Sequence, residues 1–305
     1  MKKTILATAV AAVISGPAAA LESDFYGNIR LQLHSANNLS IDSSKLIIGW
    51  KGSEDLDNGN TVSFKLEMEH DDPQSKNSGW DNDRSWVAFG SDWGKVTLGR
   101  EDTFDGWTNA GTDIFAINGG HGYFAGNELD NGIQYRGGSG MFKFGIGAEL
   151  QDDGTDGISG ATNTTYGISL EGENWQVGYH SADADSNALT SKGIGAAVNP
   201  GETATNIGGY YTLGNFTLGV TIGDSGEAAN EDVTDIVLGF PLGPCGALIG
   251  MASGDNLDAA SPNPSGDIMN LGYNCSSGSA YYGLEYNDDD AELDAVFIGY
   301  FGLRF

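Results

Sequence analysis

Six carboxylates lie between residues 101 and 135, and no lysine or arginine accompanies them there. Carboxylates gathered in a narrow passage attract cations and repel anions, so this stretch is suited to selecting ions. On an exposed loop the same residues would form only a solvated acidic surface, and both interpretations stay open for this stretch. The six are Glu101, Asp102, Asp105, Asp113, Glu128 and Asp130.

Bond-making chemistry has no comparable candidate. The four histidines lack metal-ligand spacing, and the G-x-S-x-G motif of serine hydrolases is absent. We therefore expect neither an enzyme nor a resident cofactor or metal. Acidic runs at 152–153, 231–232 and 288–290 could bridge divalent cations such as calcium, although none has the spacing of an EF-hand.

The elements that must position these carboxylates have the two-residue period of β-strands. Several stretches place apolar residues on one face and charges, threonines or glycines on the other. Each stretch is about ten residues long, which is enough for a tilted strand to cross a bilayer. They include residues 25–34, 61–70, 141–150, 215–223 and 293–305.

Short and long connections alternate along the chain, which is typical of a transmembrane β-barrel. "SDWGK" and "TLGN" are short links, whereas the links after residues 100 and 180 are long. An apolar stretch at 193–198 would break this alternation as an extra strand, so we assign it to a loop. We predict an all-β, antiparallel barrel of sixteen strands. Their centres lie near residues 29, 47, 65, 86, 97, 134, 146, 167, 178, 209, 219, 236, 249, 271, 283 and 299.

The first twenty residues have the features of a secretory signal peptide. Lys2 and Lys3 precede a short apolar run, and three alanines follow at 18–20. The run is too short to cross a bilayer as a helix. We predict cleavage after Ala20 and a single barrel domain over residues 21–305.

The chain is strongly acidic, with 14 basic and 42 acidic residues and a formal net charge of −28. This charge argues against nucleic acid as a partner. Charges on the predicted inward strand faces are more balanced, so most of the acidic excess falls in loops. The inward set comprises Arg30, Lys51, Lys65, Arg84, Arg136, Lys143 and Arg304 against Glu67, Glu69, Glu149, Glu171, Glu285 and Asp294.

The two cysteines fall at the same end of two neighbouring predicted strands. Cys245 opens the thirteenth strand, and Cys275 closes the fourteenth. An antiparallel register that places Ile249 opposite Leu271 also brings the cysteines together, and the periplasm permits oxidation. A Cys245–Cys275 disulfide and two free thiols facing lipid are the two alternatives.

Several segments, in this order, resemble the general diffusion porins of Gram-negative outer membranes. "KLIIGWKGSEDLDNGNTVSFKLEMEHD" is similar to the second and third strands of that family, and "NDRSWVAFGSDWGKVTLGREDTFDGW" to its fourth and fifth. "TDIFAINGG" resembles the constriction segment of the third loop, and the final Phe305 resembles the C-terminal assembly signal. The resemblance implies an outer-membrane homotrimer of sixteen-stranded pores, each narrowed by an inward-folded third loop.

The resemblance also implies a constriction between a loop side and a wall side. Arg84, Arg100 and Asp113 stand at family positions, whereas Ile117 and Ile47 replace a carboxylate and an arginine. Lys45 lies on the same face as Ile47, and Glu128 stands where the family has a further arginine, so we expect a negative field. The loop side is predicted to be Glu101, Asp102, Asp105 and Asp113, and the wall side Arg30, Lys45, Lys65, Arg84, Arg100 and Glu128.

These features predict an outer-membrane channel for small hydrophilic solutes and ions, with a preference for cations. Its expected partners are two further copies of the chain, outer-membrane lipid and lipopolysaccharide, and the outer-membrane assembly machinery. A non-conducting structural or adhesive barrel is the alternative function. A soluble, secreted β-protein or hydrolase is a third, and detergent-free extraction would identify it.

Overall fold

The computed structural model describes residues 22–35, 40–56, 58–70, 79–117, 128–152, 158–184, 202–224, 226, 232–255, 265–289 and 295–305. The predicted signal peptide, the stretch at 193–198 and Asp294 lie outside these residues. Among the described residues, no helix is long and apolar enough to cross a membrane.

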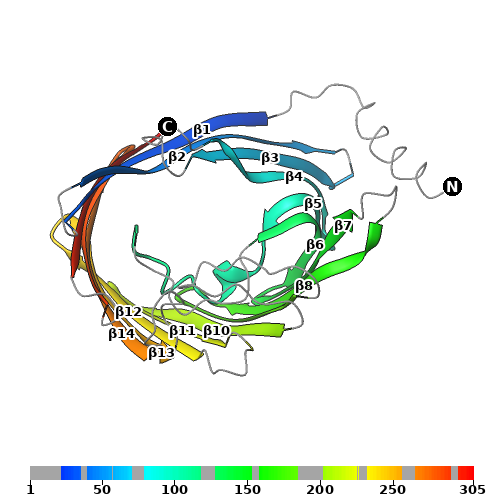
Figure 1. Cartoon of the computed structure of the whole chain (residues 1–305). Coiled ribbons are helices and arrows are strands. Elements are labelled where there is room, and N and C mark those ends of the chain that lie inside the picture. The colour runs from blue at the N-terminus through cyan, green and yellow to red at the C-terminus, as the bar shows by residue number, and fades with distance from the viewer. Residues whose placement is uncertain are drawn as a thin grey trace.

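In these described residues, sixteen antiparallel strands form one closed barrel, as predicted (Figure 1). Each strand pairs with its neighbours in sequence, and β1 closes the ring by pairing with β16. The strands are β1 Glu22–His34, β2 Ser40–Asp55, β3 Thr61–His70, β4 Asp81–Ser91, β5 Gly94–Asp102, β6 Glu128–Ser139, β7 Phe142–Asp152, β8 Ile158–Glu171, β9 Trp175–Ala184, β10 Glu202–Leu213, β11 Phe216–Asp224, β12 Asp232–Leu242, β13 Cys245–Asp255, β14 Ser265–Ser277, β15 Ala280–Asp289 and β16 Val296–Arg304.

The outer face of the barrel is apolar and the inner face is mostly polar. In β16, Phe297 and Phe301 are 50% and 49% exposed, whereas Ile298 and Tyr300 between them are 4% and 6% exposed. The same alternation places Leu31 and Leu33 of β1 on the outside. In lipid a strand edge cannot stay unpaired, so closure of the ring satisfies the backbone while the outer side chains contact lipid.

Tight two-residue turns join most of the hairpins at one end of the barrel, among them β6–β7, β10–β11, β12–β13 and β14–β15. Gly140, Gly214, Gly243 and Gly278 have φ values from 60° to 64° in these turns. Type II′ hairpin turns require a positive φ at their first central residue, which glycine adopts without steric cost. We call this the short-turn end, and the opposite end the long-loop end.

The third connection at the long-loop end begins at Thr103 and is described as far as Ile117. It contains one turn of 3-10 helix, η1 (Asp105–Trp107). In Figure 1 the segment lies within the ring of strands. Residues 103–117, called here the inner segment, lie against the inner wall.

Candidate pore constriction

The inner segment rests on a row of glycines that leaves room for its backbone. A Cβ at Gly178 would overlap the carbonyl group of Trp107, and one at Gly219 would overlap Gly111. These collisions are with main-chain atoms, so no rotamer change could relieve them. The row, called here the glycine floor, comprises Gly145, Gly167, Gly178, Gly208, Gly219, Gly250 and Gly272 on β7 to β14.

Hydroxyl groups fix the middle of the inner segment above the floor. The Thr221 hydroxyl of β11 donates to the carbonyl oxygen of Thr108 at 3.0 Å. The hydroxyls of Thr221 and Thr112 are 2.8 Å apart, and both residues are buried. Buried hydroxyls that are satisfied in this way hold a segment at one position along the wall.

The far end of the inner segment is held by opposite charges. The buried Glu285 carboxylate of β15 accepts the backbone N–H of Ala116 at 2.7 Å and that of Ile117 at 3.2 Å. Arg30 of β1 donates to the carbonyl oxygen of Ala116. Hydrogen bonds to ionised groups are stronger than neutral ones, so this is a firm attachment between residues far apart in sequence.

The near end of the inner segment is anchored by Arg136 of β6. Its Nη2 donates to the carbonyl oxygens of Asp102 at 2.7 Å and Thr103 at 2.6 Å. Its guanidinium lies 5.3 Å from the ring centre of Phe104, which is 1% exposed. Phe104 in turn packs edge-on against the buried His180, so the first residues of the segment are firmly packed.

On the other side of the lumen, β4 to β6 carry a charged network. The buried Arg84 forms ion pairs with Asp83, Asp102 and Glu128. Arg100 pairs with Glu128 at 2.5 Å and with Asp130 at 3.1 Å. Two arginines therefore share four carboxylates, an excess of two negative charges.

The lysines predicted on the wall are each paired with a glutamate. Lys45 lies 2.9 Å from Glu69, and Lys65 lies 3.3 Å from Glu67. Glu67 also accepts the hydroxyl of Tyr26 at 2.5 Å. These lysines therefore add little net positive charge to the lumen.

The predicted division between loop side and wall side is wrong for two residues. Glu101 and Asp102 are the last residues of β5, not loop residues. Glu101 lies 3.9 Å from Lys95, and Asp102 pairs with Arg84 instead of facing it across the lumen. The pairing of β5 with β6 shifts register after Gly99, whose φ is 120°. Such an irregularity interrupts the in-and-out alternation of side chains although the strand continues to Asp102, so the sequence pattern did not predict these last residues as strand.

The remaining predicted residues lie on different elements of the barrel. Asp105 lies in η1, and Asp113 is an exposed residue of the inner segment. Glu128 is the first residue of β6, and Ile47 is buried on the inner face of β2.

Sequence reasoning missed the anchoring residues of the segment. It placed Glu285 and Arg136 only among the inward charges, and it did not single out Asp83. Alternation identifies the inward face of a strand. No sequence signal connects Glu285 with Ala116 and Ile117, which precede it by 169 and 168 residues.

Two further predicted features lie away from the lumen. Cys245 and Cys275 form a disulfide, with their Cα atoms 4.5 Å apart. Phe305 exchanges backbone hydrogen bonds with Gly27 at 2.9 and 3.1 Å, and its ring covers Gly27. Within the described ranges, no group of three or more His, Cys, Asp or Glu could hold a metal ion.

Solved porin structures share this fold at low sequence identity. A mutant of the Rh. blastica porin has a TM-score of 0.71 at 15% identity, covering 93% of this chain and all of that one. Salmonella typhi OmpF, in a complex with daunomycin, has a TM-score of 0.70 at 12% identity, covering 93% and 97%. Vibrio cholerae OmpT lacking loop L8 has a TM-score of 0.68 at 16% identity, covering 94% and 99%. These likenesses establish the fold.

No curated protein sequence matches the chain. The sequence model of the Gram-negative porins, however, matches residues 7–299. This match spans nearly all of the barrel, so the chain belongs to the Gram-negative porin family, the diffusion channels of the outer membrane.

Proposed function

We propose that this porin is a general diffusion channel for small hydrophilic solutes that favours cations over anions. The observation that carries the proposal is the excess of carboxylates around Arg84 and Arg100, whose two positive charges meet four negative ones. Fixed carboxylates in a narrow passage with low-dielectric walls raise the local concentration of cations.

The other charges near the inner segment support the same sign. Lys45, Lys65 and Lys95 are each within 4 Å of a glutamate, so their fields are largely cancelled at a distance. Asp113 is exposed on the inner segment, and among the described residues no lysine or arginine forms an ion pair with it. Its charge therefore acts directly on passing ions.

The zero-current potential of the purified protein in a planar bilayer under a KCl gradient tests both parts of the proposal. We expect stable conductance steps and a potential that favours K⁺. Asp113→Asn should reduce that potential, whereas Asp92→Asn, in the β4–β5 turn at the short-turn end, should leave it nearly unchanged.

The other results each contradict one part. Anion preference with normal conductance would refute the proposed sign of the field and leave the channel intact. Absence of any conductance would refute the channel and favour the structural or adhesive barrel.

The export and assembly route belongs to the same proposal. We place a cleaved signal peptide at residues 1–20, a homotrimer in contact with lipopolysaccharide, and recognition of Phe305 by the assembly machinery. A trimer form is described for OmpT of Vibrio cholerae, a barrel similar to this one. Mass measurement of the detergent-extracted complex tests the trimer. Loss of membrane-inserted protein in a Phe305→Ala variant tests the role of Phe305.

A further inference from the structure

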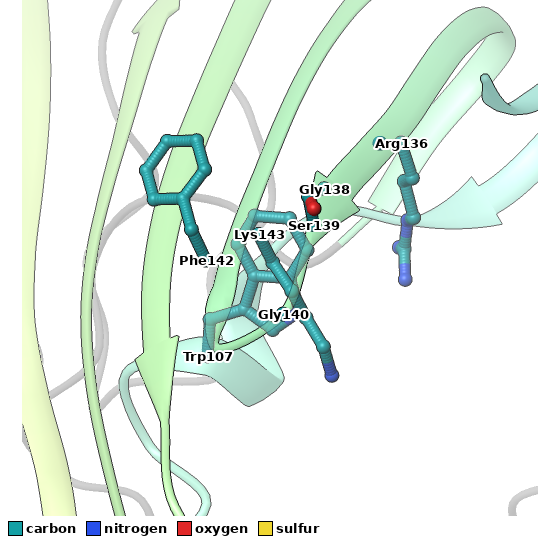
Figure 2. Close-up of a pocket in the computed structure, with 8 residues that line it drawn as sticks. Trp107, Arg136, Gly138, Ser139, Gly140, Phe142 and Lys143 are labelled. Carbon is teal, nitrogen blue, oxygen red and sulfur yellow. The ribbon is translucent and has the colours of Figure 1, made fainter.

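A cleft opens beside the inner segment at the short-turn end of β6 and β7 (Figure 2). Its volume is about 400 Å³, within the range of sites for small organic molecules. Figure 2 shows the side chains of Arg136 and Lys143 extending away from Phe142, with the indole of Trp107 behind Lys143. The lining residues are Trp107, Arg136, Gly137, Gly138, Ser139, Gly140, Phe142 and Lys143.

The cleft concentrates positive charge in a chain that has little of it. Lys95 is directly opposite Arg136 in the β5–β6 register, and Lys143 is opposite Gly138 in the β6–β7 register. Three of only 14 basic residues are therefore neighbours on this patch of wall. Glu101 and Glu171 compensate Lys95 and Lys143, so Arg136 leaves the group with a net charge of +1.

Arg136 is immobilised before any ligand arrives. Its Nε donates to the Gln134 side chain at 2.5 Å, and its Nη2 donates to the carbonyl oxygens of Asp102 at the end of β5 and of Thr103 in the inner segment. No hydrogen bond within the described part of the chain uses its Nη1. A fixed guanidinium with a remaining donor binds an anion without losing further side-chain entropy.

Lys143 and Trp107 complete the chemistry of the cleft. The Lys143 ammonium lies 2.5 Å from Glu171, and its side chain is 44% exposed, so it can turn toward a second anion. Trp107 is packed against Phe104, with ring centres 4.9 Å apart, which holds its indole in place. An indole beside two cations suits a ligand with a flat apolar body and one anionic group.

We propose that this cleft binds small aromatic monocarboxylates and delays them on the short-turn side of the inner segment. The carboxylate lies between Arg136 Nη1 and the Lys143 ammonium, and the ring packs against Trp107. The inference rests on the proposed function, because the solute must reach the cleft through an open pore.

Sodium benzoate is the probe for this site. In single-channel recordings in KCl, benzoate should cause brief, concentration-dependent interruptions of the current. Inorganic phosphate at the same anion charge should cause far fewer, because it has no surface to pack on Trp107.

Three matched variants separate the cleft from the general field of the pore. Lys143→Gln should shorten the interruptions about tenfold, the lower end of the loss expected for one charged hydrogen bond. Glu171→Gln should lengthen them, because Lys143 loses its competing partner. Lys51→Gln removes an exposed lysine outside the cleft and should leave the interruptions unchanged.

Calorimetric titration of the detergent-solubilised barrel with benzoate measures the same contacts without current. Normal conductance with no benzoate binding would refute the proposed binding at the cleft and leave the proposed channel function intact. Equal effects of Lys143→Gln and Lys51→Gln would also refute that binding, because the charge would then act only at long range. Benzoate binding without conductance would support the cleft and refute the channel.

Discussion

The two sides of the lumen differ in the side chains that they present to it. From β7 to β14 the wall carries the glycine floor, on which main-chain atoms of the inner segment and the rings of Phe104 and Phe115 lie. From β1 to β6 the wall carries long charged side chains that are paired with one another. One side positions the inner segment by leaving out side chains, and the other sets the field that the segment faces.

We therefore expect that the shape and the charge of the passage can be changed separately. Added volume should disturb the glycine side and leave its charge intact. Removed charge should disturb the charged side with little change of shape. Four variants, the last with two substitutions, follow in order of their expected effect on the pore.

The largest effect is expected from Gly219→Ala. The new Cβ would overlap the main chain of Gly111, so the inner segment must move toward the pore axis, at a cost of about 2 kcal/mol. Single-channel conductance should fall clearly, with the preference for K⁺ retained.

Gly239→Ala is the matched control for this change. It adds the same methyl group to the inner wall of β12, where the nearest atoms are Leu248 Cδ2 at 3.3 Å and Ile114 Cδ1 at 3.6 Å. Conductance should stay close to that of the unmodified protein. Equal conductance in Gly219→Ala would mean that the floor does not position the segment.

Arg84→Met should have the next largest effect, on selectivity and stability. It leaves Asp83, Asp102 and Glu128 close together without their shared cation, which should destabilise the barrel by about 3 kcal/mol. The zero-current potential should move further toward K⁺. Denaturant unfolding and the KCl gradient measure the two quantities.

Lys45→Met serves as the control for Arg84. Lys45 forms one pair with Glu69 and its side chain is 33% exposed, so its loss should cost less than about 1 kcal/mol. A similar loss of stability in both variants would contradict the special role of the Arg84 network.

Glu285→Gln should have a smaller effect, confined to the end of the inner segment. The amide keeps one oxygen for the N–H groups of Ala116 and Ile117 but turns a donor toward the other, at a cost of about 1 kcal/mol. Hydrogen exchange at residues 113–117 should become faster, and the open-channel current noisier. Glu149→Gln is the control, because this carboxylate accepts a hydrogen bond from the Asn163 amide of β8 and should change neither quantity.

The smallest effect on the pore is expected from replacing Cys245 and Cys275 by serine. The disulfide closes a loop of 30 residues, so its loss should lower the free energy of unfolding by about 3 kcal/mol. The paired register of β13 and β14 remains, so conductance and selectivity should not change. A changed conductance would show that this hairpin helps to shape the lumen.

The barrel could be predicted from sequence because its signal is local. Alternation identified the inward and outward faces of β1, β3, β7, β11 and β16, and the register of Ile249 with Leu271 held in the structure. Lipid outside and water inside demand this period from every strand, so it recurs throughout the chain.

The constriction could be predicted only in part, because its contacts are not local. Register shifts after Glu67 and Gly99 displace the alternation near Arg84 and Asp102. The attachment of Ala116 to Glu285 joins residues 169 apart in the sequence. Neither a β-bulge nor a contact between residues far apart in the chain produces a periodic pattern in the sequence.

The seam between β1 and β16 has a consequence for the time course of folding. Every other pairing joins strands adjacent in sequence, with a small entropy of loop closure, whereas Ile29 meets Leu303 across nearly the whole chain. Hairpins can therefore form early, and closure comes last. Until then β1 and β16 each expose an unpaired edge that can capture another chain, so the unclosed intermediate is the species most prone to aggregate.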